Sequence, residues 1–251
     1  MKKPFSSNAL KYIAVVAMLI DHIAWSFVPL STIWGQIMHF IGRFTAPIMC
    51  YFITEGYFHT KDIRKYIFRL GIFAVISQIP FVIAEKLTSP PLMFTDGKLW
   101  INPELLMPSF NVIFTLTAGL VALFLWRIEE IEKPLRIMIV IAICLISLTG
   151  DWMFFSVLWI LFFGIYRDDS QKKWIAYYCI AIPAMAIVIM SNISSGLPLW
   201  HNFWQLGILV PPFILQLYNK ERGSKNPFHK WFFYIFYPLH LLIIGIIKFY
   251  I

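Results

Sequence analysis

Two ionisable residues stand side by side inside an apolar stretch near the start of the sequence. Asp21 and His22 lie within residues 10–29, LKYIAVVAMLIDHIAWSFVP, which are long enough to cross a bilayer as a helix. A carboxylate at bilayer depth costs about 2.5–3.5 kcal/mol on insertion scales, so such groups face a partner or an aqueous cavity rather than lipid. An imidazole, whose unperturbed pKa is about 6.5, is suited to general-base chemistry. Asp21 and His22 are therefore candidate catalytic residues.

The partner of Asp21 is predicted by its position relative to the next apolar stretch. Asp21 precedes Thr32 by eleven residues and Arg43 follows it by eleven, so the two side chains should lie at similar depth in an antiparallel helical hairpin. An Asp21–Arg43 ion pair would lower the cost of burying both charges. A purely structural role for this pair is the alternative.

His22 faces elsewhere, because adjacent helical residues point about 100° apart. Its partner must therefore come from another helix, unless it is only a hydrogen-bonded packing residue. His240, in the middle of the last apolar segment and two residues after the kink expected at Pro238, is one candidate. Asp151, in a tight turn at residues 149–152, is the other.

A polar stripe follows Arg43 along the second apolar segment. Pro47, Tyr51 and Glu55 come at intervals of four residues, and Glu55 and His59 form a further pair at the same spacing. The stripe predicts a polar path along one helical face, although the last pair would also suit simple solvation at a membrane interface.

The elements that must position these residues are membrane-spanning helices. Of the 251 residues, 59% are hydrophobic and 14% charged, and the mean hydropathy is +0.72. These values predict an all-α integral membrane protein, a single domain over residues 1–251. Nine apolar segments can be drawn, at about 10–29, 34–58, 66–84, 109–126, 135–149, 152–166, 174–190, 204–218 and 231–250. Segments 135–149 and 152–166 are shorter than the roughly 20 residues of a full span.

The net charge of +8 predicts topology rather than nucleic-acid binding. If the N-terminus is cytoplasmic, most lysines and arginines fall on the inner side, and only Lys86, Lys98 and Lys248 fall outside. This asymmetry matches the positive-inside rule and places the C-terminus outside. The long outer loop, at about 85–108, is expected to be irregular because it is rich in proline. The three cysteines lack metal-like spacing, so we expect no metal.

Six phrases, in order along the chain, carry a family resemblance. They are LKYIAVVAMLIDHI from Leu10, IGRFTAPIMCYFITEGYFHTKDIRKYIFRL from Ile41, NVIFTL from Asn111, GDW from Gly150, LYNKERG from Leu217 and FYIFYPLHL from Phe233. Together they resemble the TraX family of bacterial membrane proteins over nearly the whole chain. The resemblance implies acetylation of the amino terminus of conjugative pilin, by a multi-pass protein of the inner membrane.

A wider similarity connects the first segment with transmembrane acyltransferases of the acyltransferase-three type. Those enzymes carry an arginine, ten residues and then a histidine on their first helix, and Lys11 and His22 have that spacing here. The resemblance implies that His22 is the catalytic base and that Lys11 meets the phosphates of acetyl-CoA at a cytoplasmic mouth. Lysine keeps the charge of arginine but loses its bidentate geometry.

The sequence thus predicts a membrane-embedded acetyltransferase that moves an acetyl group from cytoplasmic acetyl-CoA to an amine or hydroxyl of an extracytoplasmic peptide or glycan. His22 would be the base, Arg43 or His240 would stabilise the oxyanion, Asp21 would hold Arg43, and Asp151 would border the site. Candidate acetyl-CoA contacts are Lys11, Glu55, His59, Lys61, Arg64, Arg69 and Arg222.

Two other classes of function fit the same residues. A proton-coupled transporter would use Asp21, Arg43 and His22 as a relay, although we find no inverted repeat of the kind common in transporters. A noncatalytic scaffold would dock a secreted peptide. Membrane lipid is an expected partner in every case, and the sequence leaves a homodimer open.

Overall fold

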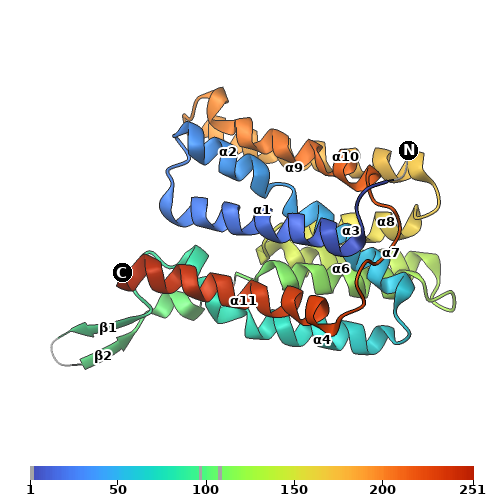
Figure 1. Ribbon diagram of the computed structural model, residues 1–251, viewed down its shortest axis with the longest axis horizontal. Helices are drawn as coiled ribbons and strands as arrows, with labels where there is room; N and C mark the ends of the chain where they lie inside the picture. Colours follow the sequence, from blue (N-terminus) through green and yellow to red (C-terminus); the bar gives the residue numbers. More distant parts are fainter. Residues whose placement is uncertain (1–2, 96–97, 107–108) are drawn as a thin grey trace.

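The computed structural model describes residues 3–95, 98–106 and 109–251, and nearly all of their regular structure is helical, which confirms the predicted class. The helices run along the long axis of the molecule (Figure 1). The α-helices are α1 (Ser7–Phe27), α2 (Ile33–Gly42), α3 (Thr45–His59), α4 (Ile63–Ile76), α5 (Gln78–Phe81), α6 (Val112–Trp126), α7 (Lys133–Ile146), α8 (Met153–Ile165), α9 (Ser170–Ser194), α10 (Pro211–Gln216) and α11 (Pro227–Tyr250). The other helical segments are the π-helix η1 (Val82–Lys86) and the 3-10 helices η2 (Pro103–Leu106), η3 (Ser147–Thr149) and η4 (Leu199–Leu209).

Capping residues fix where the site-bearing helices begin. The Ser6 hydroxyl accepts a hydrogen bond from the Ala9 N–H at 3.3 Å and starts α1, which ends just before Pro29. The Asn111 side chain accepts from two N–H groups in the first turn of α6. Pro227 occupies the first turn of α11, where its missing N–H costs nothing. These local signals set the register of the helices that carry the polar residues.

Four helices are long and apolar enough to cross a membrane. They are α1, the continuous run Ile33–His59 that joins α2 and α3, α9 and α11. A fifth span results if Ile63–Ile76 and Gln78–Lys86, which are bent by 46° relative to each other, cross together. Helices α6 and α8 are apolar but shorter. The chain is therefore a membrane protein; the nine-span count and its orientation stay predictions.

The chain ends lie at opposite ends of the long axis (Figure 1). Near the N-terminus, Phe5 pairs with Tyr218 and donates its N–H to the Leu217 carbonyl. At the other end, the Lys248 ammonium donates to the carbonyls of Ala84 and Leu87 at 3.1 and 3.0 Å. We call these the N-terminal end and the C-terminal end of the bundle.

The loop before α6 departs from its predicted irregular form. Strands β1 (Leu92–Thr95) and β2 (Lys98–Ile101) pair antiparallel, and Leu92 lies opposite Ile101. The hairpin projects beyond the bundle at its C-terminal end (Figure 1). The prolines flank the strands rather than interrupting them, so they do not prevent the pairing.

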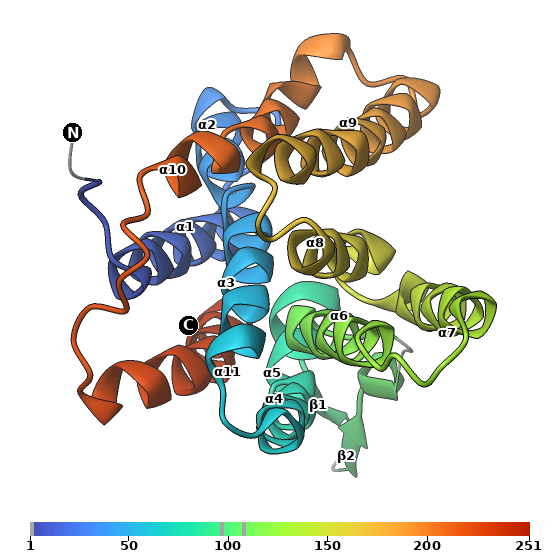
Figure 2. The same ribbon diagram turned by 90° about the vertical axis from the view of Figure 1, so that its right-hand side faces the viewer.

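The largest core cluster joins α6 and α8 to α3. Leu120, Leu123 and Ile160 are completely buried there. The Thr54 hydroxyl donates to the Ile160 carbonyl at 3.1 Å, which ties α3 to α8. Viewed from the end, α7 and α9 lie at the periphery of the bundle (Figure 2). The rigid centre thus presents α3 to the neighbouring α1 and leaves α7 on an outer face.

Candidate functional site

The first and last helices meet through a pair of histidines. His22 Nδ1 lies 2.7 Å from His240 Nε2, and the two rings are stacked with centroids 5.0 Å apart. His22 is 9% exposed and His240 5%. The predicted partner of His22 on another helix is therefore His240, and Asp151 does not make this contact.

The hydrogen bonds of His240 determine which nitrogen is free to act. His240 Nδ1 lies 2.7 Å from the Phe236 carbonyl, an acceptor, so this nitrogen carries the proton. In the neutral ring, Nε2 of His240 is then an acceptor, and His22 Nδ1–H donates a hydrogen bond to it. This assignment leaves Nε2 of His22 with a lone pair and, among the described residues, no hydrogen-bond partner. Such a nitrogen is suited to receive a proton.

Asp21 contacts two side chains, His39 on α2 and Arg43 at the C-cap of that helix. Its Oδ1 lies 2.7 Å from His39 Nδ1, and its Oδ2 lies 3.7 Å from an Arg43 terminal nitrogen. The predicted Asp21–Arg43 pair is therefore present. Gly42 makes it achievable, because a Cβ there would collide with the Asp21 side chain. The carboxylate is shared with His39, which is 1% exposed and which the sequence reasoning did not select.

Tryptophans enclose this charged group. The Arg43 guanidinium lies 4.6 Å from the Trp152 ring centroid and 4.5 Å from that of Trp204. The Trp25 ring lies 4.4 Å from that of His39. Cation–π contacts of desolvated guanidinium groups contribute about 2 kcal/mol or more. Arg43 is thus rigidly held by Asp21 and two rings.

Asp151 contributes to this region through its backbone. Its N–H donates to the Phe110 carbonyl at 2.8 Å, and its carbonyl accepts from the Thr115 hydroxyl at 2.9 Å. These bonds hold the turn in which Trp152 adopts a left-handed conformation with φ 59°. Asp151 therefore positions Trp152 over Arg43 and does not touch the histidine pair.

A cavity of about 530 Å³ runs from the N-terminal end of the bundle toward the histidines. Residues of α1, α3, α4, α6 and α11 line it. Its deepest lining includes Met18, one helical turn before His22, and Tyr237, three residues before His240. The Tyr237 ring lies 6.4 Å from that of His22 and 5.7 Å from that of His240. The histidine pair therefore lies directly past the inner end of the cavity.

The Tyr237 hydroxyl is a further polar group at this inner end. It is buried, and its O–H has no acceptor among the described residues. A buried hydroxyl without a partner is costly, so such a group commonly serves a ligand or water. The sequence reasoning missed it, since one tyrosine among several aromatics in the last segment gives no signal.

The opposite end of the cavity is basic. Its lining contains five cations and a single carboxylate, Glu55; the cations are Lys11, Arg69, Lys220, Arg222 and Lys230. The Lys11 ammonium lies 5.3 Å from the Phe52 ring centroid and 5.8 Å from that of Phe233. Arg69 Nε donates to the Tyr234 hydroxyl at 3.1 Å. Lys11, Arg69 and Arg222 thus line the same end of the cavity. Lys220, after the end of α10, and Lys230, in the first turn of α11, join them, and the sequence analysis did not select these two residues.

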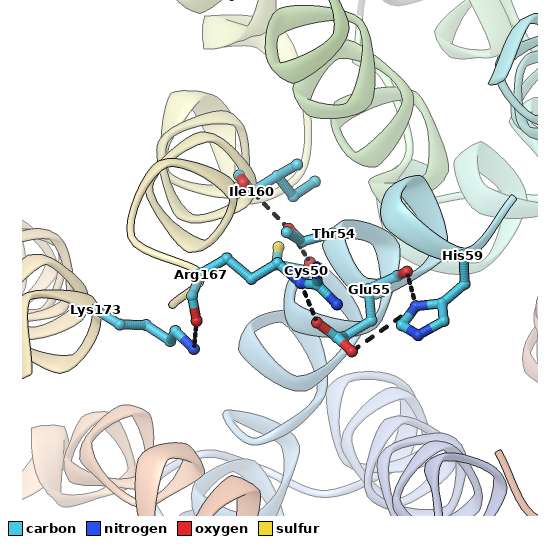
Figure 3. A network of polar contacts seen from close by, with 7 residues as sticks. All are labelled: Cys50, Thr54, Glu55, His59, Ile160, Arg167 and Lys173. Atoms are coloured by element: carbon cyan, nitrogen blue, oxygen red, sulfur yellow. Dashed lines mark hydrogen bonds and ion pairs between the residues drawn. The ribbon is translucent and has the colours of Figure 1, made fainter. Parts of the chain in front are cut away.

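Glu55 and His59 take part in a polar network at the edge of the cavity (Figure 3). Glu55 Oε1 lies 3.4 Å from Arg167 Nε, and His59 Nδ1 donates to the Glu55 carbonyl at 2.7 Å. Lys173 in turn donates to the Arg167 carbonyl at 2.6 Å. The predicted helical pair is present, and its carboxylate is engaged with Arg167.

Two of the residues predicted to contact acetyl-CoA do not line the cavity. Lys61 lines a separate hollow beside α6 and α7, and Arg64 is exposed and lines neither the cavity nor the hollow. The reason is helical direction: α4 begins at Ile63 and turns Arg69, but not Arg64, toward the cavity. Within the described residues no group of three His, Cys, Asp or Glu side chains is placed to hold a metal ion.

Comparison with known proteins extends over nearly the whole chain. Residues 6–248 match the family model described as TraX protein. The chain is also 31% identical over 247 residues to a probable fimbrial assembly protein FimC, serogroup H1, of Dichelobacter nodosus, covering 96% of this chain and 94% of that protein. No solved structure matches significantly. The family match covers every element of the cavity and the histidine pair, and the chain belongs to the TraX family.

Proposed function

We propose that this protein is an acetyltransferase of the bacterial inner membrane that uses acetyl-CoA from the cytoplasm and an extracytoplasmic acceptor. The observation that carries the proposal is the cavity, which has a basic mouth at one end and a buried histidine pair just past its other end. Its volume lies within the range of about 300–1,000 Å³ that is typical of small-molecule sites.

The charges of the cavity fit the donor. The phosphates of acetyl-CoA would lie among Lys11, Arg69 and Arg222, and arginine guanidinium groups bind phosphate through paired hydrogen bonds. The pantetheine arm would extend between the apolar walls, past Met18, and bring the thioester to the inner end. The acyl group would thereby reach the middle of the membrane while the nucleotide stays at the mouth.

The histidine pair supplies the base. His22 Nε2 would take the proton from the acceptor amine or hydroxyl as that atom attacks the thioester carbonyl carbon. His240 holds the ring of His22 in the correct tautomer through the bond to Nδ1. When the tetrahedral intermediate collapses, the C–S bond breaks and the CoA sulfur leaves with the proton from His22. The proton that His22 takes from the acceptor is thus passed to the CoA thiol, and His22 returns to its neutral form.

The Tyr237 hydroxyl is placed to donate to the oxyanion. Tyr237 lines the inner end of the cavity, close to His22, and its O–H has no competing acceptor among the described residues. Of the two residues that we expected in this role, His240 orients His22, and Arg43 lies against Asp21 and two tryptophan rings and does not line the cavity. Arg43 and Asp21 are therefore positioning residues that stabilise the α1–α2 hairpin.

A fibre subunit fits the acceptor side of the proposal. The similar D. nodosus protein is described as a probable fimbrial assembly protein. An acceptor of that kind, with a free amino terminus, would reach His22 from the extracytoplasmic side. A peptide amine is thus preferred here over a glycan hydroxyl.

Purified protein incubated with radiolabelled acetyl-CoA tests the proposal. Acetyl transfer to an amino-terminal peptide, or acetyl-CoA hydrolysis, should fall by about 10²–10⁴-fold in His22→Gln, which is the usual contribution of a general base. His201→Gln is the matched control, because this buried histidine lies on η4 and its ring makes no hydrogen bond among the described residues. Thermal stability should be similar in both variants.

Two outcomes favour other functions. If acetyl-CoA neither binds nor turns over, while solute flux into liposomes depends on Asp21, the protein is a transporter. If a fibre-subunit peptide binds and acetyl-CoA has no effect on it, the protein is a scaffold. A His22→Gln variant that keeps most of its turnover would exclude the assigned base.

A further inference from the structure

A second hollow, of about 640 Å³, lies at the N-terminal end of the bundle, apart from the cavity described above. The turn between α3 and α4, the end of α6 and the start of α7 line it. Phe58 links it to the cavity edge, because the Arg167 guanidinium that pairs with Glu55 also lies 4.4 Å from the Phe58 ring centroid. The two sites are thus neighbours at one membrane face.

Three cations and one carboxylate line this hollow, namely Lys61, Arg127, Arg136 and Glu129. The excess of positive charge favours an anionic ligand. Arg127 lies with its guanidinium 5.2 Å from the Phe58 ring centroid, which fixes its position without neutralising its charge.

Arg136 is the residue that points most directly to a ligand. One of its terminal nitrogens donates to the Trp126 carbonyl at 2.9 Å, and its guanidinium lies 5.6 Å from the Trp126 ring centroid. Its Nε is buried and has no hydrogen-bond partner among the described residues. The Nε–H of a guanidinium held in this way is available as a donor, and the planar group matches the geometry of a phosphate.

The surroundings favour a phosphate that belongs to a lipid. Helix α7 begins at this hollow and presents exposed apolar residues along its length, among them Leu135, Met138, Ile141 and Leu145. It lies at the periphery of the bundle (Figure 2). In a membrane protein such a face meets acyl chains, so a headgroup in the hollow would continue into tails along α7. Basic pockets between transmembrane helices commonly hold anionic headgroups.

We propose that the hollow formed by Lys61, Arg127 and Arg136 binds the phosphate of an anionic membrane lipid. This site is separate from the cavity and does not depend on the acetyltransferase reaction. By the predicted topology, the lipid is in the cytoplasmic leaflet.

Lipid binding to the full-length protein in detergent tests this assignment. Phosphatidylglycerol should raise the melting temperature in a saturable way, and phosphatidylcholine with the same acyl chains should not. Arg127→Gln and Lys61→Gln should each weaken the apparent affinity for phosphatidylglycerol about fivefold, the effect expected of one basic residue at a membrane surface. Arg136→Gln should weaken it at least as much.

Lys98→Gln is the matched control, because this exposed lysine lies on the β-hairpin at the opposite end of the bundle and should leave the affinity unchanged. Arg136 also bonds the end of α6, so its variant could lose stability; Lys61, which is exposed, keeps the test decisive. Equal stabilisation by phosphatidylcholine, equal loss in Lys98→Gln or absence of any shift would overturn the proposal. A shift reproduced by inorganic phosphate alone would overturn the lipid assignment in favour of a soluble phosphate.

Discussion

His22 and His240 differ in what their second nitrogens can do. The hydrogen bond from His240 Nδ1–H to the Phe236 carbonyl fixes the proton on that nitrogen. The lone pair that is free to act as a base is therefore on Nε2 of His22. Tyr237 adds a hydroxyl donor near the same point. At the scale of single residues, the proposed base, its orienting partner and the proposed oxyanion donor are thus three different side chains from two helices.

Tyr237→Phe should separate the oxyanion role from packing. The ring stays in place and only the unpartnered hydroxyl is lost, so we expect kcat to fall about 10²–10³-fold with KM for acetyl-CoA nearly unchanged. Steady-state kinetics with varied acetyl-CoA measures both. A rise in KM at constant kcat would instead place the hydroxyl in ground-state binding.

Asp21→Asn should destabilise the protein by about 3–5 kcal/mol, because it leaves Arg43 as a buried charge without its carboxylate. The shorter contact to His39 adds to the loss. Chemical unfolding in detergent measures the effect. His39→Gln in the Asp21→Asn background should cost much less than it does alone, and additive costs would contradict a shared network.

The residues of this charged group show how far the sequence reasoning reached. Asp21 and Arg43 could be paired by counting, because they belong to consecutive helices joined by a short turn. His39 was missed although it precedes Arg43 by one helical turn and faces the same carboxylate. His22 and His240 are 218 residues apart. Each could be selected as a polar residue in an apolar segment, but no rule based on local spacing could show that they are in contact.

Helices α2 and η4 approach each other closely enough to position Arg43. A Cβ on Gly207 would collide with the Phe40 carbonyl, and Trp204 on the same 3-10 helix covers the Arg43 guanidinium. At the scale of elements, this close backbone approach is what brings the tryptophan onto the cation. The β-hairpin lies where we expected an irregular loop, because the pairing of its two short strands is not revealed by hydrophobic periodicity.

Gly207→Ala should push η4 away from α2 and cost about 1–3 kcal/mol, as overpacking usually does. Gly71→Ala in α4 is the matched control, since nothing lies within 4 Å of its added methyl group. That variant should be neutral or stabilising by about 0.5–1 kcal/mol, through helix propensity alone. Unfolding midpoints of the two variants provide the comparison; equal effects would argue against the close contact.

At the scale of the whole molecule, the two bundle ends are chemically different. The N-terminal end carries the basic mouth and the second basic hollow, whereas the C-terminal end carries the β-hairpin. The chain ends lie at opposite ends of the long axis (Figure 1). The orientation itself follows from charge asymmetry and is open to direct test.

A membrane-impermeant maleimide applied to intact cells should distinguish the two faces. In a variant whose three native cysteines are replaced, Lys98→Cys on the hairpin should react at once. Lys225→Cys, exposed near the start of α11, should react only after the membrane is permeabilised. The reverse pattern would invert the topology and place the cavity mouth outside.

The contact between α1 and α11 also has a consequence for how the protein is made. Helix α1 leaves the ribosome before α11, yet the proposed general base on α1 bonds an imidazole on α11. A nascent chain inserted up to α10 would contain His22 without its partner. On the proposed function, activity should therefore appear only after α11 has been inserted, and chains terminated before α11 should be inert toward acetyl-CoA.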